Sequence, residues 1–429
     1  RAAAPPEIDD PLRDPETCIL ARLLRQGEDG LEAPGAKERR WQWARPQVEG
    51  QGPCARGGHS ATLVGPTDPQ KASARIVLFG GHYDGGAGEG FSYLGDTHVL
   101  DIDENAWYLP RCRGTAPEPR YGHSAALVGT RVVYFGGRGS SGHFRDLHAL
   151  DAGSMTWYQG PSSGGAPSAR HGHTATLHGT RLCVFGGACG ARYFGDLHCL
   201  DLSSMAWSSP PTSGPGPSAR CGHAALLVGE SLLVHGGFCM DSAEIATKDD
   251  SGDLLRSCYL SDIRVLDVHR MRWSRLRTHG APPAGRFGHS LVLSDDDVLL
   301  FGGWSGAARE GGRGASSLRG RVGGEGAEEG EETCDHCMTL RTSDMSWVRN
   351  RYSGAPAPRR YGHTATAIGP HLIIIGGWDG GKPLGDVVVL RDRSAAADKA
   401  AEAADGAGWG GAGEEEEEDD DFGLETGEG

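Results

Sequence analysis

A four-residue motif, Arg-x-Gly-His, recurs six times and constrains the fold of this chain more than any other feature. Its copies begin at Arg56, Arg120, Arg170, Arg220, Arg286 and Arg360. In five copies an apolar run ends in a Gly-Gly pair 13 positions after the histidine, as at Gly136-Gly137, and in the first copy the pair follows after 21 positions. Repetition at this spacing indicates an architecture in which each repeat is one small supersecondary unit.

Each repeat continues with a segment like Asp-Leu-His-x-Leu-Asp and then with a tryptophan. In the second repeat these are Asp146 to Asp151 and Trp157. The last repeat lacks a tryptophan at the matching place, whereas Trp43 stands 13 residues before Arg56, the same spacing that separates each later tryptophan from the next arginine. We therefore expect a strand around Trp43 to complete the last repeat.

The composition favours short strands joined by turns. The 429 residues include 69 Gly and 24 Pro, and both residue types disfavour helix interiors. Runs such as Arg131 to Phe135 and His371 to Ile375 are β-branched or apolar and end at a Gly pair, as buried strands do. An all-β fold follows.

The order Arg-x-Gly-His, apolar-Gly-Gly, Asp-x-x-x-Leu and Trp resembles the kelch repeat family over Trp41 to Leu390. The resemblance implies a six-bladed β-propeller with four antiparallel strands per blade, closed by the N-terminal strand so that the repeat array has no open ends. We expect this propeller at residues 41–391. Residues 1–40 should form an N-terminal segment with a short helix at Asp14 to Gln26, and residues 392–429 a disordered tail, Ala/Gly-rich and then acidic.

The repeated Arg, His, Asp, Gly and Trp residues are interpreted as structural. A side chain that recurs in every blade serves each blade alike, by tying loops and satisfying buried backbone groups. In the second and closing blades these residues are Arg120, His123, Gly136, Gly137, Asp146, Trp157 and Trp43. The fifth repeat carries His336 where aspartate is expected, so we expect its blade to be the least regular.

Insertions mark one face of the predicted propeller. Strands in a blade alternate direction, so the Gly-pair-to-Asp loop and the Trp-to-Arg loop open on the same face. The first of these loops spans nine positions in repeats two, three and six, but 15, 25 and 33 in repeats one, four and five. Residues 238–261 are rich in apolar residues and could order or meet a partner, whereas residues 307–332 are Gly-rich and charged and are expected to be disordered.

Side chains at the mouth of this face differ between blades, and we predict that they bind a partner. Exposed aromatic and Arg residues are favoured at binding surfaces. The candidates are His82, Arg138, Phe238, Trp304 and Trp378 after the Gly pairs, Tyr121, Phe287 and Tyr361 within the His motifs, and Met240 and Tyr259 in the fourth-repeat insertion. The alternative is that these side chains only fill the mouth of the funnel.

Charge and cysteine content restrict the class of protein. The formal charge is −15, and residues 392–429 carry 14 acidic and two basic residues, so the other 391 residues carry only −3; this argues against nucleic acid as a partner. The sequence has no apolar run of about 18 residues, so we predict no membrane span. We also find no basic-then-apolar leader and predict no signal peptide. Eleven scattered Cys residues indicate a reduced, cytoplasmic protein, with a nuclear location also open.

Candidate chemistry is sparse. The metal-like cluster Cys334-Asp335-His336-Cys337 would need a second close pair for a structural zinc, and Cys239 and Cys258 flank the neighbouring insertion. We predict no metal, no cofactor and no enzymatic activity. The predicted function is that of a monomeric adaptor or scaffold for a protein or peptide partner; the alternative is a sugar-acting enzyme or small-ligand binder that uses the central depression.

Overall fold

The computed structural model describes residues 39–65, 74–84, 90–160, 163–240, 257–305 and 332–393. Within these ranges all regular secondary structure consists of β-strands, so the all-β prediction is confirmed. The predicted helix at Asp14 to Gln26, the acidic tail and most of residues 307–332 lie outside the described residues. Within the described ranges, no helix has the length and apolar character needed to cross a bilayer.

The second repeat shows how the motifs build one unit. Strand β10 (Ser124–Val128) follows the motif histidine, β11 (Arg131–Phe135) leads into the Gly pair, and β14 (Leu147–Asp151) and β15 (Thr156–Gln159) follow. The four strands pair antiparallel in chain order. A short strand, β9 (Arg113–Gly114), adds a parallel edge beside β15.

The same four-strand order recurs along the chain. The first repeat contains β3 (Ser60–Val64), β4 (Arg75–Phe79), β7 (Thr97–Asp101) and β8 (Ala106–Tyr108), with β2 (Glu49–Gly50) beside β8. The third contains β17 (Thr174–His178), β18 (Arg181–Phe185), β21 (Leu197–Asp201) and β22 (Ala206–Ser208), with β16 (Ser163–Gly164) beside β22. The fourth contains β23 (Ala224–Val228), β24 (Ser231–Met240), β25 (Ser257–Asp267) and β26 (Arg272–Arg275).

The fifth and sixth repeats share one eight-stranded sheet. The fifth contains β27 (Phe287–Ser294), β28 (Asp297–Trp304), β29 (Glu332–Arg341) and β30 (Ser346–Ser353), and the sixth β31 (Thr364–Ile368), β32 (His371–Trp378) and β33 (Pro383–Asp392). The fourth strand of the sixth repeat is β1 (Arg40–Ala44), whose Trp43 lies opposite Leu390 in an antiparallel pair with β33. This pairing agrees with the expectation drawn from the Trp43 spacing. On its other side β1 runs parallel to β30, which joins the two repeats.

The segment after each Gly pair extends the sheet beyond the main strands. In the first three repeats it forms a separate small hairpin: β5 (His82–Asp84) with β6 (Phe91–Tyr93), β12 (Arg138–Gly139) with β13 (Gly142–His143), and β19 (Ala188–Cys189) with β20 (Arg192–Tyr193). In the fourth repeat the extension is continuous with the main strands, and the long ribbon of β24 and β25 pairs Phe238 with Tyr259 beyond a bulge between His235 and Gly237.

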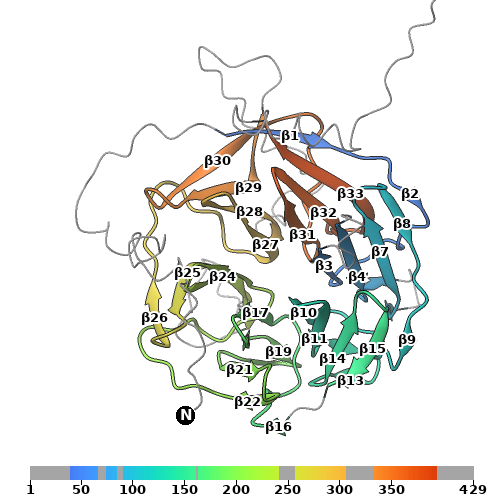
Figure 1. Cartoon of the computed structure of the whole chain (residues 1–429). Helices are drawn as coiled ribbons and strands as arrows, with labels where there is room; N and C mark the ends of the chain where they lie inside the picture. The colour runs from blue at the N-terminus through green and yellow to red at the C-terminus, as the bar shows by residue number, and fades with distance from the viewer. Residues whose placement is uncertain are drawn as a thin grey trace, which may run out of the picture.

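Glycines of the six His motifs link all repeats into a closed ring. The Gly122 amide donates to the Gly58 carbonyl at 2.8 Å, and the series continues through Gly172, Gly222, Gly288 and Gly362 until the Gly58 amide donates to Gly362 at 2.7 Å. All six have φ between 60° and 66°, where glycine is favoured. A closed series requires the repeats to surround one axis, as Figure 1 shows, so the arrangement is propeller-like.

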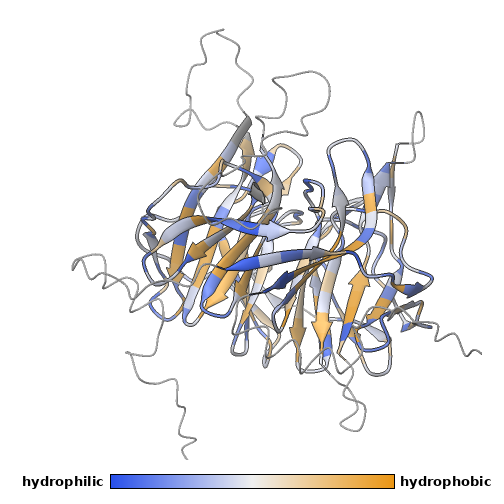
Figure 2. Cartoon of the chain, turned by 90° about the horizontal axis from the view of Figure 1, so that it is seen from above, coloured by the Kyte–Doolittle hydropathy of each residue, from blue (hydrophilic) through white to orange (hydrophobic). Residues whose placement is uncertain are grey.

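The hydrophobic core lies between adjacent sheets. Phe135 of the second repeat packs against Trp207 of the third, with ring centroids 5.1 Å apart, in a cluster that includes Leu182 and Val184. Trp43 packs in the same way against Phe301 of the fifth repeat at 5.6 Å. Figure 2 shows orange hydrophobic segments on the strands, with blue hydrophilic segments among them. The core between neighbouring sheets is therefore built mainly from strand residues.

Candidate functional site

The arginine of the His motif is buried and organises the loops at one face. Arg120 is 1% exposed, and its Nη1 and Nη2 atoms donate to the Asp146 carboxylate at 2.6 and 2.9 Å. Nη1 also donates to the Gly136 carbonyl at 2.9 Å, and Nε to the Glu118 carbonyl at 2.8 Å. The same carboxylate pairing is made by Arg56 with Asp96, Arg170 with Asp196, Arg220 with Asp262, and Arg360 with Asp386.

Electrostatics favour the ionised aspartate in these pairs. Burial of Asp146 opposes ionisation, but hydrogen bonds from His148 and Arg120 outweigh it and hold the pKa of this carboxyl well below its usual range. In the fifth repeat His336 stands at the aspartate position, and Arg286 Nη1 still donates to the Gly302 carbonyl at 2.8 Å. The arginine-to-glycine contact is therefore kept where the aspartate is replaced.

The motif histidines join neighbouring repeats by side-chain hydrogen bonds. His123 Nε2 is 2.9 Å from Ser60 Oγ, and His173 Nε2 is 2.9 Å from Ser124 Oγ, in each case one repeat back along the chain. Burial, reinforced by Arg120, lowers the pKa of His123 to about 3. Its imidazole is therefore neutral at physiological pH and acts as a structural link.

A central depression of about 160 Å³ is lined by these motifs and opens to solvent. Its wall consists of the glycine and histidine of each motif: Gly58, His59, Gly122, His123, Gly172, His173, Gly222, His223, Gly288, His289, Gly362 and His363. The histidines are buried, which lowers the pKa of His59, His223 and His363 to about 3. Among the described residues this wall therefore carries no charged side chain at neutral pH.

Aromatic side chains surround the mouth above this depression. In the first half of the ring, His82 contacts Tyr121 with ring centroids 4.4 Å apart, and Tyr121 contacts His171 at 5.7 Å. Tyr121 and Arg138 exchange backbone hydrogen bonds of 2.9 Å, and the Arg138 side chain is exposed. Burial raises the pKa of Tyr121, so its hydroxyl stays protonated.

The second half of the ring holds a larger aromatic group. Phe238 contacts Tyr259 at 5.4 Å, and Tyr259 stacks on Phe287 at 5.9 Å with an interplanar angle of 25°. Phe287 contacts Tyr361 at 5.4 Å, and Tyr361 contacts Trp304 at 5.6 Å. All five side chains are partly exposed. We call His82, Tyr121, Arg138, Phe238, Tyr259, Phe287, Trp304 and Tyr361 the rim.

Two of the predicted contact residues, Trp378 and Met240, are not part of the rim. Trp378 is only 8% exposed, because its indole ring lies against Gly57, where an added Cβ would come within 2.2 Å of Trp378 Cδ1. Gly57 occupies the place that Tyr121 and Tyr361 fill in their own repeats. Trp378 therefore fills a gap in the rim and offers little surface, which corrects its expected exposure. Met240 ends β24, and its side chain lies outside the described residues.

Three aromatic residues near the rim were not among the sequence candidates. Phe91 is 62% exposed and contacts His82 at 5.4 Å, and Tyr93 stacks on Tyr121 at 5.8 Å. Tyr193 contacts Phe238 at 6.0 Å. All three lie on the returning strand of a small hairpin, so a search for aromatics on both strands after each Gly pair would have found them.

The cysteine cluster of the fifth repeat is partly described. Cys337 is fully buried in β29, and Asn350 Nδ2 donates to its Sγ at 3.5 Å. The side chains of Cys334, Asp335 and Cys258 lie outside the described residues. Cys337 therefore packs as a small apolar side chain within the sheet.

Comparison with known proteins agrees with this architecture. The model of the KLHDC2/KLHL20/DRC7 Kelch-repeats domain matches residues 70–303, more than half of the chain, and a Kelch motif model matches residues 359–392. The human Rab9 effector protein with kelch motifs is 33% identical over 113 residues, which are 26% of this chain and 28% of that protein. Kelch domain-containing protein 3 of Bos taurus is 35% identical over 96 residues, 22% of each chain.

A plant relative is matched over a smaller share of its length. Acyl-CoA-binding domain-containing protein 4 of Arabidopsis thaliana is 35% identical over 98 residues, 23% of this chain and 13% of that protein. The matches thus span between about an eighth and a little over a quarter of these three relatives. The family model over more than half of the residues shows that the chain belongs to the kelch-repeat family.

Proposed function

We propose that this chain is a six-bladed propeller that acts as a scaffold and binds a partner protein or peptide through the rim. Each blade would consist of one four-strand unit, with β1 completing the sixth. The glycine ring supports this count, because six motif glycines close the series of hydrogen bonds. A ring closed in this way is a rigid platform for side chains that the repeat leaves free to vary.

The rim carries the proposal. Its aromatic side chains are partly exposed and packed against one another, so little side-chain entropy is lost when a partner covers them. Aromatic and arginine residues dominate binding energy at protein interfaces, and Arg138 places an exposed positive charge beside Tyr121. The sequence predicts that the longest insertions, which follow Phe238 and Trp304, open on this same face.

The central depression offers less to a small-molecule substrate. Its described wall holds glycine and neutral histidine, and the Nε2 atom of His123 is already bound to Ser60. Acid–base chemistry on a sugar requires carboxylates or other ionisable groups facing the substrate. The name of the human relative, an effector of Rab9, describes recognition of another protein, and this supports the interaction function.

The test is quantitative capture of partners from a cell lysate with the full chain. The variant Tyr121→Ala/Phe238→Ala/Trp304→Ala removes three aromatic rings from separate parts of the rim. We expect it to lose at least about tenfold of the specifically captured partner, since removal of such anchors commonly costs 2 kcal/mol or more each. Arg138→Glu reverses an exposed charge beside Tyr121 and should weaken the same capture.

A matched control lies on the outer edge of the ring. Tyr158 on β15 is 45% exposed and Leu109 after β8 is 61% exposed, so Leu109→Ala/Tyr158→Ala removes similar apolar surface away from the rim. This control should capture the same partners as the wild type. Equal partner lists for the wild type, the triple variant and Arg138→Glu would refute the assignment of the rim.

A further inference from the structure

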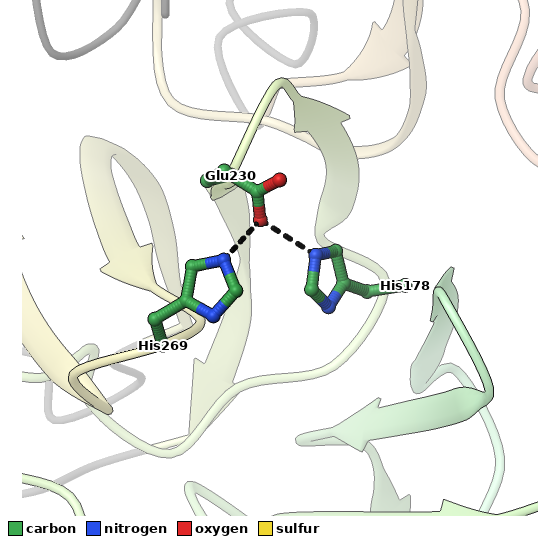
Figure 3. Close-up of side chains that lie close together, drawn as sticks. All are labelled: His178, Glu230 and His269. Carbon is green, nitrogen blue, oxygen red and sulfur yellow. Dashed lines mark hydrogen bonds and ion pairs between the residues drawn. The ribbon is translucent and has the colours of Figure 1, made fainter. Parts of the chain in front are cut away.

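A cluster of three metal-ligand side chains lies on the face opposite the rim. His178 ends β17, Glu230 lies in the turn between β23 and β24, and His269 lies in the turn between β25 and β26. Figure 3 shows both imidazoles pointing at the carboxylate. His178 Nε2 and His269 Nε2 are 2.6 and 2.7 Å from the same Glu230 oxygen, Oε2.

The repeat does not require any of these residues. In the second repeat the matching positions are Val128, Thr130 and Gly153. Three departures from the repeat thus occur in turns that the fold brings together, across the boundary between the third and fourth repeats. They were missed from the sequence because 52 residues separate His178 from Glu230, and because turns of different repeats meet only in the folded ring.

We propose that His178, Glu230 and His269 bind a divalent transition-metal ion, with Zn²⁺ as the best-matched ion. Two imidazole nitrogens and one carboxylate form a donor set that suits zinc, with a water completing a tetrahedral site. The three potential ligand atoms all lie within 4.8 Å of one another. The ion replaces two hydrogen bonds by coordinate bonds, and each neutral imidazole then carries its proton on Nδ1.

The backbone holds the cluster while the side chains retain room to adjust. The Val268 amide donates to the Glu230 carbonyl at 3.2 Å, and the His269 amide donates to Asp267 Oδ1 at 3.0 Å, which fixes the two turns of the fourth repeat. Zinc bonds of about 2.0 to 2.2 Å at tetrahedral angles place ligand atoms about 3.3 Å apart. Zinc binding would therefore lengthen the present distances of 2.6 and 2.7 Å between the imidazoles and the carboxylate to about 3.3 Å. The side chains of His178, Glu230 and His269 are 26%, 46% and 65% exposed, so they have room to move apart.

The nearest basic side chain in the sequence is already engaged. Arg270 Nη1 pairs with Asp267 Oδ2 at 2.8 Å. A bound ion would tie the third repeat to the fourth at this face, and binding only to the folded state would raise the melting temperature. The site is therefore an inter-repeat metal clamp, separate from the rim.

The experiment measures zinc bound to the full chain after chelator treatment and dialysis against ZnCl₂. We expect His178→Ala/His269→Ala to hold one zinc ion less per chain than the wild type. Glu230→Gln keeps the shape of the side chain and should weaken zinc binding about tenfold or more. His279→Ala, which removes an exposed histidine elsewhere, is the control and should match the wild type.

Cysteine-bound zinc is separated from the proposed site by difference. The chain has 11 Cys, so the decisive quantity is the wild-type content minus that of the double variant. Zinc should raise the melting temperature of the wild type and of His279→Ala but not that of the double variant, while the zinc-free proteins melt alike. Equal zinc content in wild type and double variant, or a thiolate charge-transfer band in their Co²⁺ difference spectrum, would overturn the proposal.

Discussion

Ala224 interrupts a hydrogen-bond pattern that the motif histidines otherwise repeat around the ring. In the other repeats the histidine is followed by Ser or Thr, and this hydroxyl bonds the Nε2 atom of the next motif histidine. At Ala224 the hydroxyl is absent, and His289 Nε2 instead lies 2.9 Å from His235 Nδ1. His235 stands where the first three repeats and the fifth have Phe. Two departures in one repeat thus compensate each other.

This compensation predicts energetic coupling between positions 224 and 235. In the His235→Phe background, Ala224→Ser supplies a new partner for His289 and should stabilise the fold. In the wild type the same serine finds that partner already taken. We expect a coupling of about 1 kcal/mol, the usual contribution of one hydrogen bond, measured by denaturant unfolding of the four proteins. Strictly additive effects would contradict the pairing.

The buried histidines also predict the pH dependence of stability. Burial lowers the folded-state pKa of His59, His123, His223 and His363 to about 3, whereas an unfolded histidine has a pKa of about 6.5. Between these values the unfolded state binds more protons, so stability falls as pH decreases. Each such histidine contributes up to about 1.4 kcal/mol per pH unit.

The melting temperature should therefore drop steeply from pH 6.5 to pH 5. Ionised, half-buried aspartates such as Asp146 add to the loss only below about pH 4, since their pKa is lowered in the folded state. The measurement is calorimetry at several pH values, and His123→Gln should show a shallower slope because one buried imidazole is removed. A melting temperature that stays constant from pH 7 to pH 5 would contradict the neutral, buried histidine ring.

Among the elements, β1 has the longest-range role. Its Trp43 is 4% exposed and contacts Phe301 and Tyr352, and its backbone pairs with β33. The strand thus fills the place that β15 fills in the second repeat, about 350 residues away from its partner. A strand in this position belongs to the core and not to a peripheral arm.

Trp43→Ala should therefore destabilise the protein as much as the matching change in an internal repeat. We expect a loss of about 3 to 5 kcal/mol for Trp43→Ala and for Trp157→Ala, because each leaves a large cavity between sheets. Denaturant unfolding followed by tryptophan fluorescence and circular dichroism compares them. A negligible effect at Trp43 beside a large effect at Trp157 would show that β1 is dispensable for the ring.

Most strands could be predicted from the sequence because each repeat contains the motifs that mark its own strands and turns. Equal spacing between tryptophan and arginine located β1, and apolar runs before Gly pairs located β11 and β32. Burial of Trp378 could not be predicted, because it depends on the missing side chain of Gly57 in a neighbouring repeat. The cluster of His178, Glu230 and His269 escaped for the same reason, since periodicity describes one repeat and not the contacts between two.

For the whole molecule, the ring separates two faces with different chemistry. In the fourth repeat, β24 and β25 carry Phe238 and Tyr259 of the rim near one end, and the turns of Glu230 and His269 follow at their opposite end. The rim is aromatic with an exposed Arg138, whereas the opposite face presents imidazole and carboxylate groups. Partner binding and metal binding are therefore expected to be independent, and a partner should bind equally well with and without zinc.

The most direct test of the rim is hydrogen–deuterium exchange of the chain with and without its captured partner. We predict new protection in the segments after the Gly pairs, including β5, β12 and the end of β24. The turns at Glu230 and His269 and the outer strands β8 and β15 should exchange at unchanged rates. Protection confined to the outer strands or to the opposite face, with the rim segments unaffected, would contradict the proposed binding surface.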